Sequence, residues 1–147
     1  MIENNYYPEH DFILTIFYGD STPKELHDLI DKLLEIEHDT GGMRGLTILC
    51  KEGKFKGIGA SEIMSAGEKM RHAKFRKDGK NAIVAETSLG YGLSRMYKVA
   101  ADILNLDELN IYKENELDNA IKWLEVEHLK EQIKEVLERC RYSAYIK

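Results

Sequence analysis

Short apolar runs rich in β-forming residues alternate with longer segments of helical periodicity along this chain. The runs expected to form strands are Phe12–Tyr18, Gly45–Lys51, Asn81–Glu86 and Leu109–Tyr112. Nearly continuous apolar character fits strands that are covered on both faces, as in a parallel sheet. Alternating strands and helices with short connections favour right-handed crossovers. The sequence therefore predicts an α/β fold with a four-stranded, mostly parallel sheet and flanking helices, and Met1–Asp11 is a candidate for an extra N-terminal edge strand.

The segment Leu89–Tyr97 marks the passage from the third expected strand into a helix. It follows the apolar run Asn81–Glu86 and carries Gly90 and Gly92 in its first turn. Glycine early in a helix lowers its stability by about 1 kcal/mol relative to alanine. The two glycines therefore indicate a close approach of this backbone, either to a neighbouring element or to a small ligand.

The starts of the helices carry local capping signals. Thr22 precedes a proline, and Glu25 three residues later completes a capping box. Ser61 is expected to cap a second helix after a loop, and Thr87 or Ser88 a third. We therefore expect the helix after Thr22 to be among the best-defined elements.

The C-terminal residues 125–147 form a helical extension to a predicted domain of residues 1–124. Val126, Leu129, Ile133, Val136 and Cys140 recur at alternating spacings of three and four, the pattern of a coiled-coil seam. Each large apolar side chain left in water would forgo about 1.5–3 kcal/mol of burial. The stripe must therefore pack on its own domain or on a second copy, and we expect a homodimer in which this helix takes part.

Composition and charge exclude several classes of protein. The net charge of −5 argues against nucleic-acid binding, because phosphate neutralisation needs a basic surface. No apolar run approaches the roughly 18–20 residues that a membrane span needs. The start of the chain lacks the regions of a signal peptide, and Cys50 and Cys140 alone do not indicate a disulfide framework. We therefore expect a cytoplasmic protein.

No motif for catalysis is found in the sequence. The chain contains no phosphate-binding P-loop, no GxSxG elbow, no HExxH and no CxxC. Its histidines are scattered, without the paired spacing of metal ligands. No nucleophile and base can be paired from sequence spacing. We therefore expect neither an enzyme nor a bound metal or cofactor.

One candidate ligand-binding site can still be assembled from the residue types. Ser61 is expected where backbone N–H groups converge at a helix start, which favours a phosphate there. Arg95 could bind a carboxylate or phosphate with two hydrogen bonds. Because open α/β folds bind ligands at the carboxyl edge of the sheet, we expect Ser61, Gly90, Tyr91, Gly92 and Arg95 to line one shallow site there.

These motifs resemble a known family. The segment Asn81–Tyr97, with its Gly-x-Gly-x-x-Arg-x-Tyr pattern, and the closing Ala120–Leu124 resemble the SpoIIAA-like branch of the STAS (sulfate transporter and anti-sigma factor antagonist) superfamily. The resemblance spans Phe12 to Leu124 and implies a right-handed βα superhelix without catalytic activity. In the antagonist proteins a partner kinase phosphorylates a serine at the start of the second helix, and Ser61 is the matching candidate.

Two functions follow from the sequence and the resemblance. The first is a non-catalytic, cytosolic STAS-like regulatory or binding module that binds a protein partner or a small anion. The second is a carrier of a small apolar or lipid-like ligand, by analogy with lipid-binding domains of comparable fold. A cavity lined by Leu, Met and Phe side chains would favour the carrier, whereas a solid core with a polar groove near Ser61 and Gly90 would favour the module.

Overall fold

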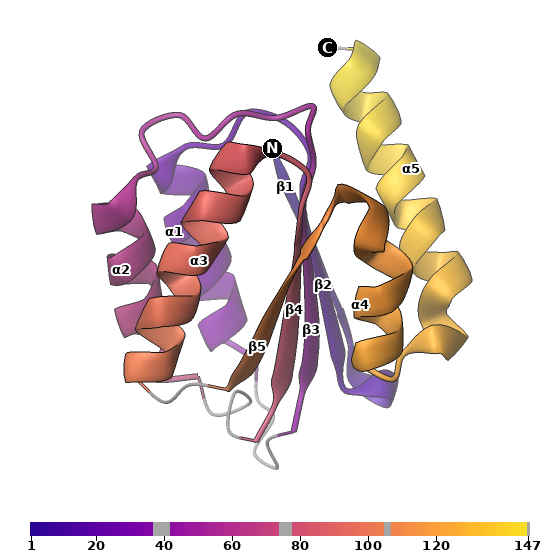
Figure 1. Cartoon of the computed structure of the whole chain (residues 1–147), viewed down its shortest axis with the longest axis horizontal. Helices are drawn as coiled ribbons and strands as arrows, with labels where there is room; N and C mark the ends of the chain where they lie inside the picture. The colour runs from indigo at the N-terminus through magenta and orange to yellow at the C-terminus, as the bar shows by residue number, and fades with distance from the viewer. Residues whose placement is uncertain (37–41, 74–77, 105–106, 147) are drawn as a thin grey trace.

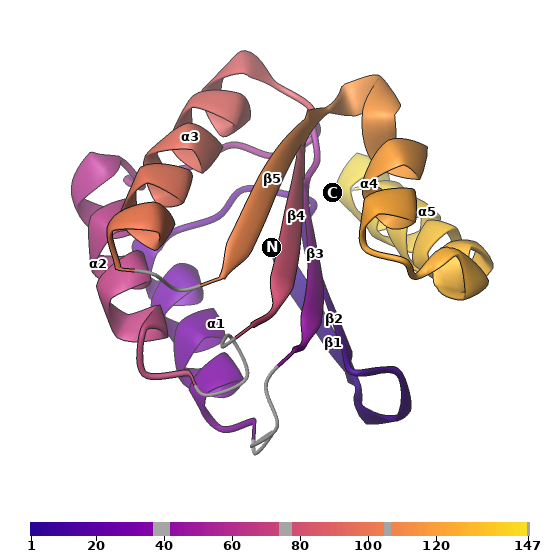
Figure 2. The same cartoon turned by 60° about the horizontal axis from the view of Figure 1, so that its bottom comes forward.

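A computed structural model describes residues 1–36, 42–73, 78–104 and 107–146, which form one sheet between two layers of helices (Figures 1 and 2). The strands of this described part are β1 (Ile2–Tyr7), β2 (Phe12–Phe17), β3 (Arg44–Leu49), β4 (Lys80–Ala85) and β5 (Glu108–Lys113). They lie side by side in the order β1-β2-β3-β4-β5. β1 is antiparallel to β2, and β2 to β5 are parallel to one another.

The helices divide between the two faces of the sheet. Helices α1 (Pro23–Leu34), α2 (Ala60–Met70) and α3 (Ser88–Ile103) cover one face, and α4 (Leu117–Trp123) and α5 (Lys130–Ile146) the other (Figure 2). Short 3₁₀ turns occupy Pro8–His10, Glu114–Glu116 and Glu127–Leu129. From β2 to β5, strands that are consecutive in the chain are neighbours in the sheet. Because these strands are parallel, their carboxyl ends meet at one edge of the sheet, at the top of Figure 1.

The predicted α/β fold with a mostly parallel sheet is confirmed, and the extra N-terminal strand is present. Pro8–His10 and Asp11, whose φ is 48°, turn the chain so that β1 pairs with β2. The expected parallel strands begin and end within two residues of the observed ones. The sheet therefore has five strands in the described part of the chain, one more than the four that the parallel runs required.

The continuous apolar runs are explained by a core on each side of the sheet. All six residues of β2 are buried. Phe12, Leu14 and Ile16 pack toward α4 and α5, whereas Ile13 and Phe17 pack toward α1 and α2. Because both faces of this strand are covered, an alternating polar pattern would place polar side chains in one of the two cores.

The C-terminal helix folds back on its own sheet. Val126, Leu129, Ile133 and Cys140 are each at most 3% exposed, and they belong to one apolar cluster with residues of β2, β3 and β4. The stripe is thus covered within a single chain. This removes the ground for expecting a homodimer through this helix, because the stripe from Val126 to Cys140 belongs to the same apolar core as the sheet.

The capping box at the start of α1 is present as expected. The Glu25 N–H donates to Thr22 Oγ1 at 3.4 Å, and the Thr22 N–H donates to Glu25 Oε1 at 3.3 Å. The N-terminal ammonium group of Met1 lies 2.9 Å from Glu25 Oε2 and is the main cause that lowers the pKa of this carboxyl. The start of α1 is therefore joined to the start of the chain.

Replacement of Thr22 by alanine should lower the free energy of unfolding by about 1 kcal/mol, because a backbone donor at the helix start loses its acceptor. Ser61→Ala is the matched control, since Ser61 is exposed in the first turn of α2 and does not cap it. Urea unfolding of the two variants measures the difference. Equal stability of both variants would show that Thr22 does not fix the start of α1.

No helix in the described ranges combines the length and apolar character needed to cross a membrane.

Candidate functional site

The start of α3 lies at the carboxyl edge of the sheet, as expected. Thr87 caps the helix, with its Oγ1 accepting from the Gly90 N–H at 3.0 Å. A Cβ on Gly90 would lie 3.1 Å from Thr87 Oγ1 and 3.5 Å from Cδ1 of Leu49, the last residue of β3. Gly90 is therefore a site of close packing between helix and sheet.

Gly92 has a different environment from Gly90. A Cβ added to Gly92 would have no atom within 4 Å. Nothing described in this protein therefore requires a glycine at position 92.

Gly92→Ala should raise the free energy of unfolding by about 0.5–1 kcal/mol, because alanine costs less backbone entropy in a helix and meets no neighbour here. Gly90→Ala is the matched comparison and should be destabilising, since its Cβ would press on the capping oxygen of Thr87. Thermal unfolding of both variants tests the difference. A loss of stability in Gly92→Ala would contradict the open environment of this residue.

Ser61 does not cap its helix, which corrects the sequence-based expectation. The cap is Gly59, whose N–H donates to Glu62 Oε1 at 2.8 Å. Ser61 is exposed one residue after the start of α2. The sequence signal for this arrangement was Glu62, three residues after the glycine, which satisfies the orphan backbone donor. Phosphorylation of Ser61 stays a prediction of the resemblance.

The remaining residues of the expected shallow site lie along α3. Tyr91 is half-buried, and Lys113 Nζ lies 5.7 Å from the centre of its ring. Arg95 is exposed. Ser61 and Arg95 are on neighbouring helices of the same layer, but within the described ranges no hydrogen bond or ion pair joins Ser61, Tyr91 and Arg95. A single site formed by these residues stays a prediction.

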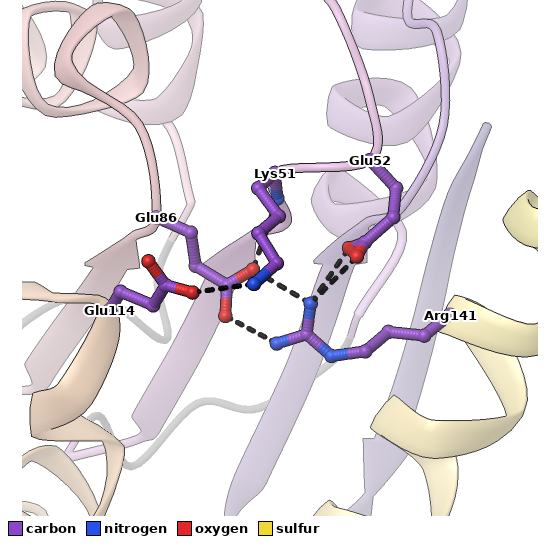
Figure 3. A network of polar contacts seen from close by, with 5 residues as sticks. All are labelled: Lys51, Glu52, Glu86, Glu114 and Arg141. Atoms are coloured by element: carbon purple, nitrogen blue, oxygen red, sulfur yellow. Dashed lines mark hydrogen bonds and ion pairs between the residues drawn. The ribbon is translucent and has the colours of Figure 1, made fainter.

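A network of charged residues, which the sequence analysis missed, occupies the carboxyl edge (Figure 3). Arg141 of α5 donates through Nη1 to Glu86 Oε1 at 2.8 Å and to Glu52 Oε1 at 2.7 Å, and through Nη2 to Glu86 Oε2. The Lys51 N–H donates to Glu86 Oε1 at 3.0 Å, and Lys51 Nζ lies 2.8 Å from Glu114 Oε1. Glu86 and Glu114 follow β4 and β5, whereas no local signal places Arg141 beside them.

The same edge contains one group of potential metal ligands among the described residues. Ligand atoms of Cys50, Glu52 and Glu86 lie within 4.8 Å of one another. However, Arg141 already pairs with both carboxylates, and burial raises the pKa of the Cys50 thiol to about 12. A cation at this position would have to displace the Arg141 guanidinium from both carboxylates. The group is therefore explained as a structural ion-pair network.

An apolar cavity of about 140 Å³ lies between the sheet and the layer of α1, α2 and α3. Side chains from every one of these helices line it, together with side chains of the sheet and of the loop before α2. The lining residues from the helices are Leu26, Leu29, Ile30, Leu33, Ile63, Ala66, Met70, Leu93, Ser94 and Tyr97, and Phe17, Leu49, Phe55, Ile58 and Ile83 are the other large apolar ones.

The floor of this cavity carries the polar side chains of Thr15, Thr47 and Asn81, and Asn4 of β1 lies beside Thr15 in the sheet; we call these four residues the polar row. Thr15, Thr47 and Asn81 line the cavity, and Thr15 pairs in register with Asn4 on one side and Thr47 on the other. Asn4 Nδ2 donates to Thr15 Oγ1 at 2.9 Å. The Oδ1 atoms of Asn4 and Asn81 are buried and have no hydrogen-bond partner in the part of the chain that the structure describes. The sequence signal was a threonine inside each of two apolar strands.

The chain matches no protein-family model, and neither a curated protein nor a solved structure was found to be similar to it. The proposal for its function therefore depends on the geometry of the described residues.

Proposed function

We propose that this protein is a non-catalytic binding protein that carries a small, mostly apolar ligand in the cavity between its sheet and α1–α3. The observation behind this proposal is the lining of the cavity, which is dominated by Leu, Ile, Met and Phe side chains. This is the feature by which the sequence analysis distinguished a carrier from a module with a solid core. Ligand sites are concave and mostly apolar, with a few polar groups that fix orientation.

The size of the cavity limits the ligand. Its volume of about 140 Å³ is close to that of an apolar cavity of about 150 Å³ that stays dry and binds benzene in another protein. Typical drug-sized ligands need larger pockets of about 300–1,000 Å³. The proposed ligand is therefore a single ring or a short alkyl chain, which excludes a long acyl chain held entirely inside.

The chemistry of the lining supports binding without catalysis. The described lining residues include no His, Asp, Glu, Lys or Cys, so no imidazole, carboxylate, amine or thiol faces the ligand. The Ser94 hydroxyl donates to the Gly90 carbonyl oxygen at 2.8 Å and is bonded within its own helix. The hydroxyl groups present are thus suited to orienting a ligand.

The proposal includes a STAS-like family and a cytoplasmic location. The consecutive order of β2 to β5, with α1–α3 on one face, is compatible with the βα superhelix that the STAS resemblance implies. Cys50 and Cys140 are free thiols, which suits a reducing cytoplasm.

Toluene is a suitable probe, because it is an apolar ring of the expected size. We expect saturable binding by isothermal titration calorimetry and loss of that binding in Ile63→Phe, which fills the cavity. Met64→Phe is the matched control, since Met64 is the next residue of α2 and is 45% exposed. Met64→Phe should bind toluene like the wild-type protein. Absence of saturable binding to the wild-type protein, or equal binding by Ile63→Phe, would contradict the proposal.

A second candidate function, protein binding, is favoured by an apolar row on the outer face of α3. Leu89, Met96, Val99 and Ile103 are 61%, 42%, 55% and 72% exposed. Together with Gly92 they recur at alternating spacings of three and four, which is the pattern of a helix-to-helix seam. Large apolar side chains gathered in this way mark an interaction surface.

The charges beside this row favour a second copy of the chain as the partner. With Met96 at the first core position of a heptad, Arg95 and Asp102 occupy equivalent flanking positions, which face each other when two copies of α3 pack antiparallel. Arg95 makes no hydrogen bond or ion pair with any described residue, and Asp102 is bonded only within α3, 3.8 Å from Lys98 Nζ. Arg95 of one copy would then pair with Asp102 of the other.

Sedimentation equilibrium at high micromolar concentration tests this surface. We expect a dimer that Val99→Lys dissociates and that Met64→Lys, on α2, leaves intact. Arg95→Asp should weaken the dimer, and the double variant Arg95→Asp, Asp102→Arg should restore it by exchanging the charges. A monomeric wild-type protein, or failure of the double variant to restore association, would overturn this second candidate.

A further inference from the structure

We infer that His10 and His128 form a surface site for a divalent transition-metal ion such as Zn²⁺. His10 ends the 3₁₀ turn between β1 and β2, and His128 lies in the 3₁₀ turn that precedes α5. These two turns meet at the bottom of Figure 1, at the edge opposite the carboxyl ends of the parallel strands. The site is separate from the apolar cavity, so the inference does not depend on the proposed function.

The spacing of the two imidazole rings suits a shared ion. Their centres lie 5.3 Å apart, and their planes are tilted by 55°. A tetrahedral Zn²⁺ ion with Zn–N distances of about 2.0–2.1 Å places the centres of two bound imidazoles about 5 Å apart. Both side chains are exposed, so each ring can turn a nitrogen toward a common ion without disturbing the core.

The ring nitrogens of His10 and His128 are available as ligands. Neither imidazole makes a hydrogen bond or an ion pair with a described residue, and the contact between the two rings is the one interaction that joins them. Neutral imidazole is the commonest metal ligand in proteins. An ion therefore displaces no protein hydrogen bond of the described residues when it binds here.

The surroundings of the pair carry negative charge that favours a cation. Glu9 and Glu127 precede the two histidines in the chain, and Glu135 lines the same open groove as His10, which has a volume of about 450 Å³. None of these carboxylates is ion-paired with a described residue. Arg139, the cation that lines the groove, is already paired at the surface. The groove thus has room for waters or a carboxylate to complete the coordination.

The ligand type determines which ions the site selects. Imidazole suits borderline ions such as Zn²⁺, Ni²⁺ and Cu²⁺, whereas Mg²⁺ and Ca²⁺ are bound through oxygen ligands. A site that depends on the two histidines should therefore bind Zn²⁺ and not Mg²⁺. A site formed by the exposed carboxylates alone would not make this distinction.

Isothermal titration calorimetry with ZnCl₂ tests the site directly. We expect saturable binding to the wild-type protein, weakened at least about tenfold in His10→Ala and in His128→Ala, because each variant removes one ligand. His72→Ala is the matched control, since it removes another exposed histidine, in the turn after α2, and should bind Zn²⁺ like the wild-type protein. MgCl₂ should give no saturable binding.

Thermal unfolding provides a second readout. Because the ion joins the β1–β2 turn to the start of α5, Zn²⁺ at 100 times its Kd should raise the melting temperature by about 5–10 °C. EDTA should reverse the shift. The melting temperature of His10→Ala should not respond to the same Zn²⁺ concentration, and that of His72→Ala should rise as in the wild-type protein.

Three outcomes would overturn the inference: no saturable Zn²⁺ binding to the wild-type protein, undiminished binding in His10→Ala and His128→Ala, or equal binding of Mg²⁺. Zn²⁺ binding that is lost in Glu52→Gln but kept in His10→Ala would place the ion at the opposite edge of the sheet and also contradict it. His10→Gln and His128→Gln give the same comparison if an alanine variant does not fold.

Discussion

Replacement of Ile133 by alanine should lower the free energy of unfolding by about 2–5 kcal/mol, because it removes a buried side chain from the interface between α5 and the sheet. Ile133 is 1% exposed and belongs to the core cluster that joins α5 to β2, β3 and β4. Ile146→Ala, on the same helix, is the matched control, since Ile146 is 62% exposed. It should change stability by less than about 0.5 kcal/mol.

Urea unfolding at low protein concentration measures both variants. The loss in Ile133→Ala should be independent of protein concentration, because the side chain is covered by its own chain. A loss that grows on dilution would instead show that a second copy covers this helix. The double variant Leu129→Glu, Ile133→Glu should fail to fold stably, since two carboxylates would enter the core.

Replacement of Arg141 by alanine should lower the free energy of unfolding by about 2–3 kcal/mol, since Glu86 would lose its cationic partner. The Glu86 side chain is 4% exposed and accepts two hydrogen bonds from Arg141. The Arg141 side chain is itself 29% exposed, which places the expected loss below that of a fully buried pair. Glu86 raises the pKa of Arg141, so the guanidinium stays charged throughout the working pH range.

The controls for this prediction use a neighbouring arginine and a shorter cation. Arg139→Ala should cost under about 1 kcal/mol, because Arg139 is 60% exposed and pairs with Glu3 at the surface. Arg141→Lys should keep less than half of the stabilisation, since an ammonium group cannot bond both Glu86 oxygens at once. The double variant Arg141→Ala, Glu86→Leu should recover part of the loss. Urea titrations of Arg141→Ala and Arg139→Ala that coincide would contradict this account.

The parts of the fold that the sequence predicted depend on local signals. The strands β2 to β4 follow from apolar runs such as Phe12–Phe17, which require cover on both faces. The start of α1 follows from Thr22 and Glu25, whose capping bonds reach across three residues. Such signals act over the range of one helical turn or one strand, so a reading of the sequence can recover them.

The candidate site was harder to predict because its parts come from distant segments. Ser61 was expected as the cap of α2, but Gly59 is the cap and its N–H donates to Glu62 Oε1. Gly90 was correctly placed at the carboxyl edge, whereas the Arg141–Glu86 pair joins residues 55 positions apart with no local pattern. A pairing at that distance is determined by where α5 packs.

The sequence by itself determined that this chain is an α/β protein with a parallel sheet, and that the stripe from Val126 to Cys140 had to be buried. Only the tertiary structure decided what buries it, since its own sheet and a second copy offer the same apolar contacts. The sequence likewise did not determine whether the core contains a cavity. Leu26, Met70 and Phe17 would satisfy the helical and strand patterns equally in a solid core, and a cavity is a volume that their packing leaves unfilled.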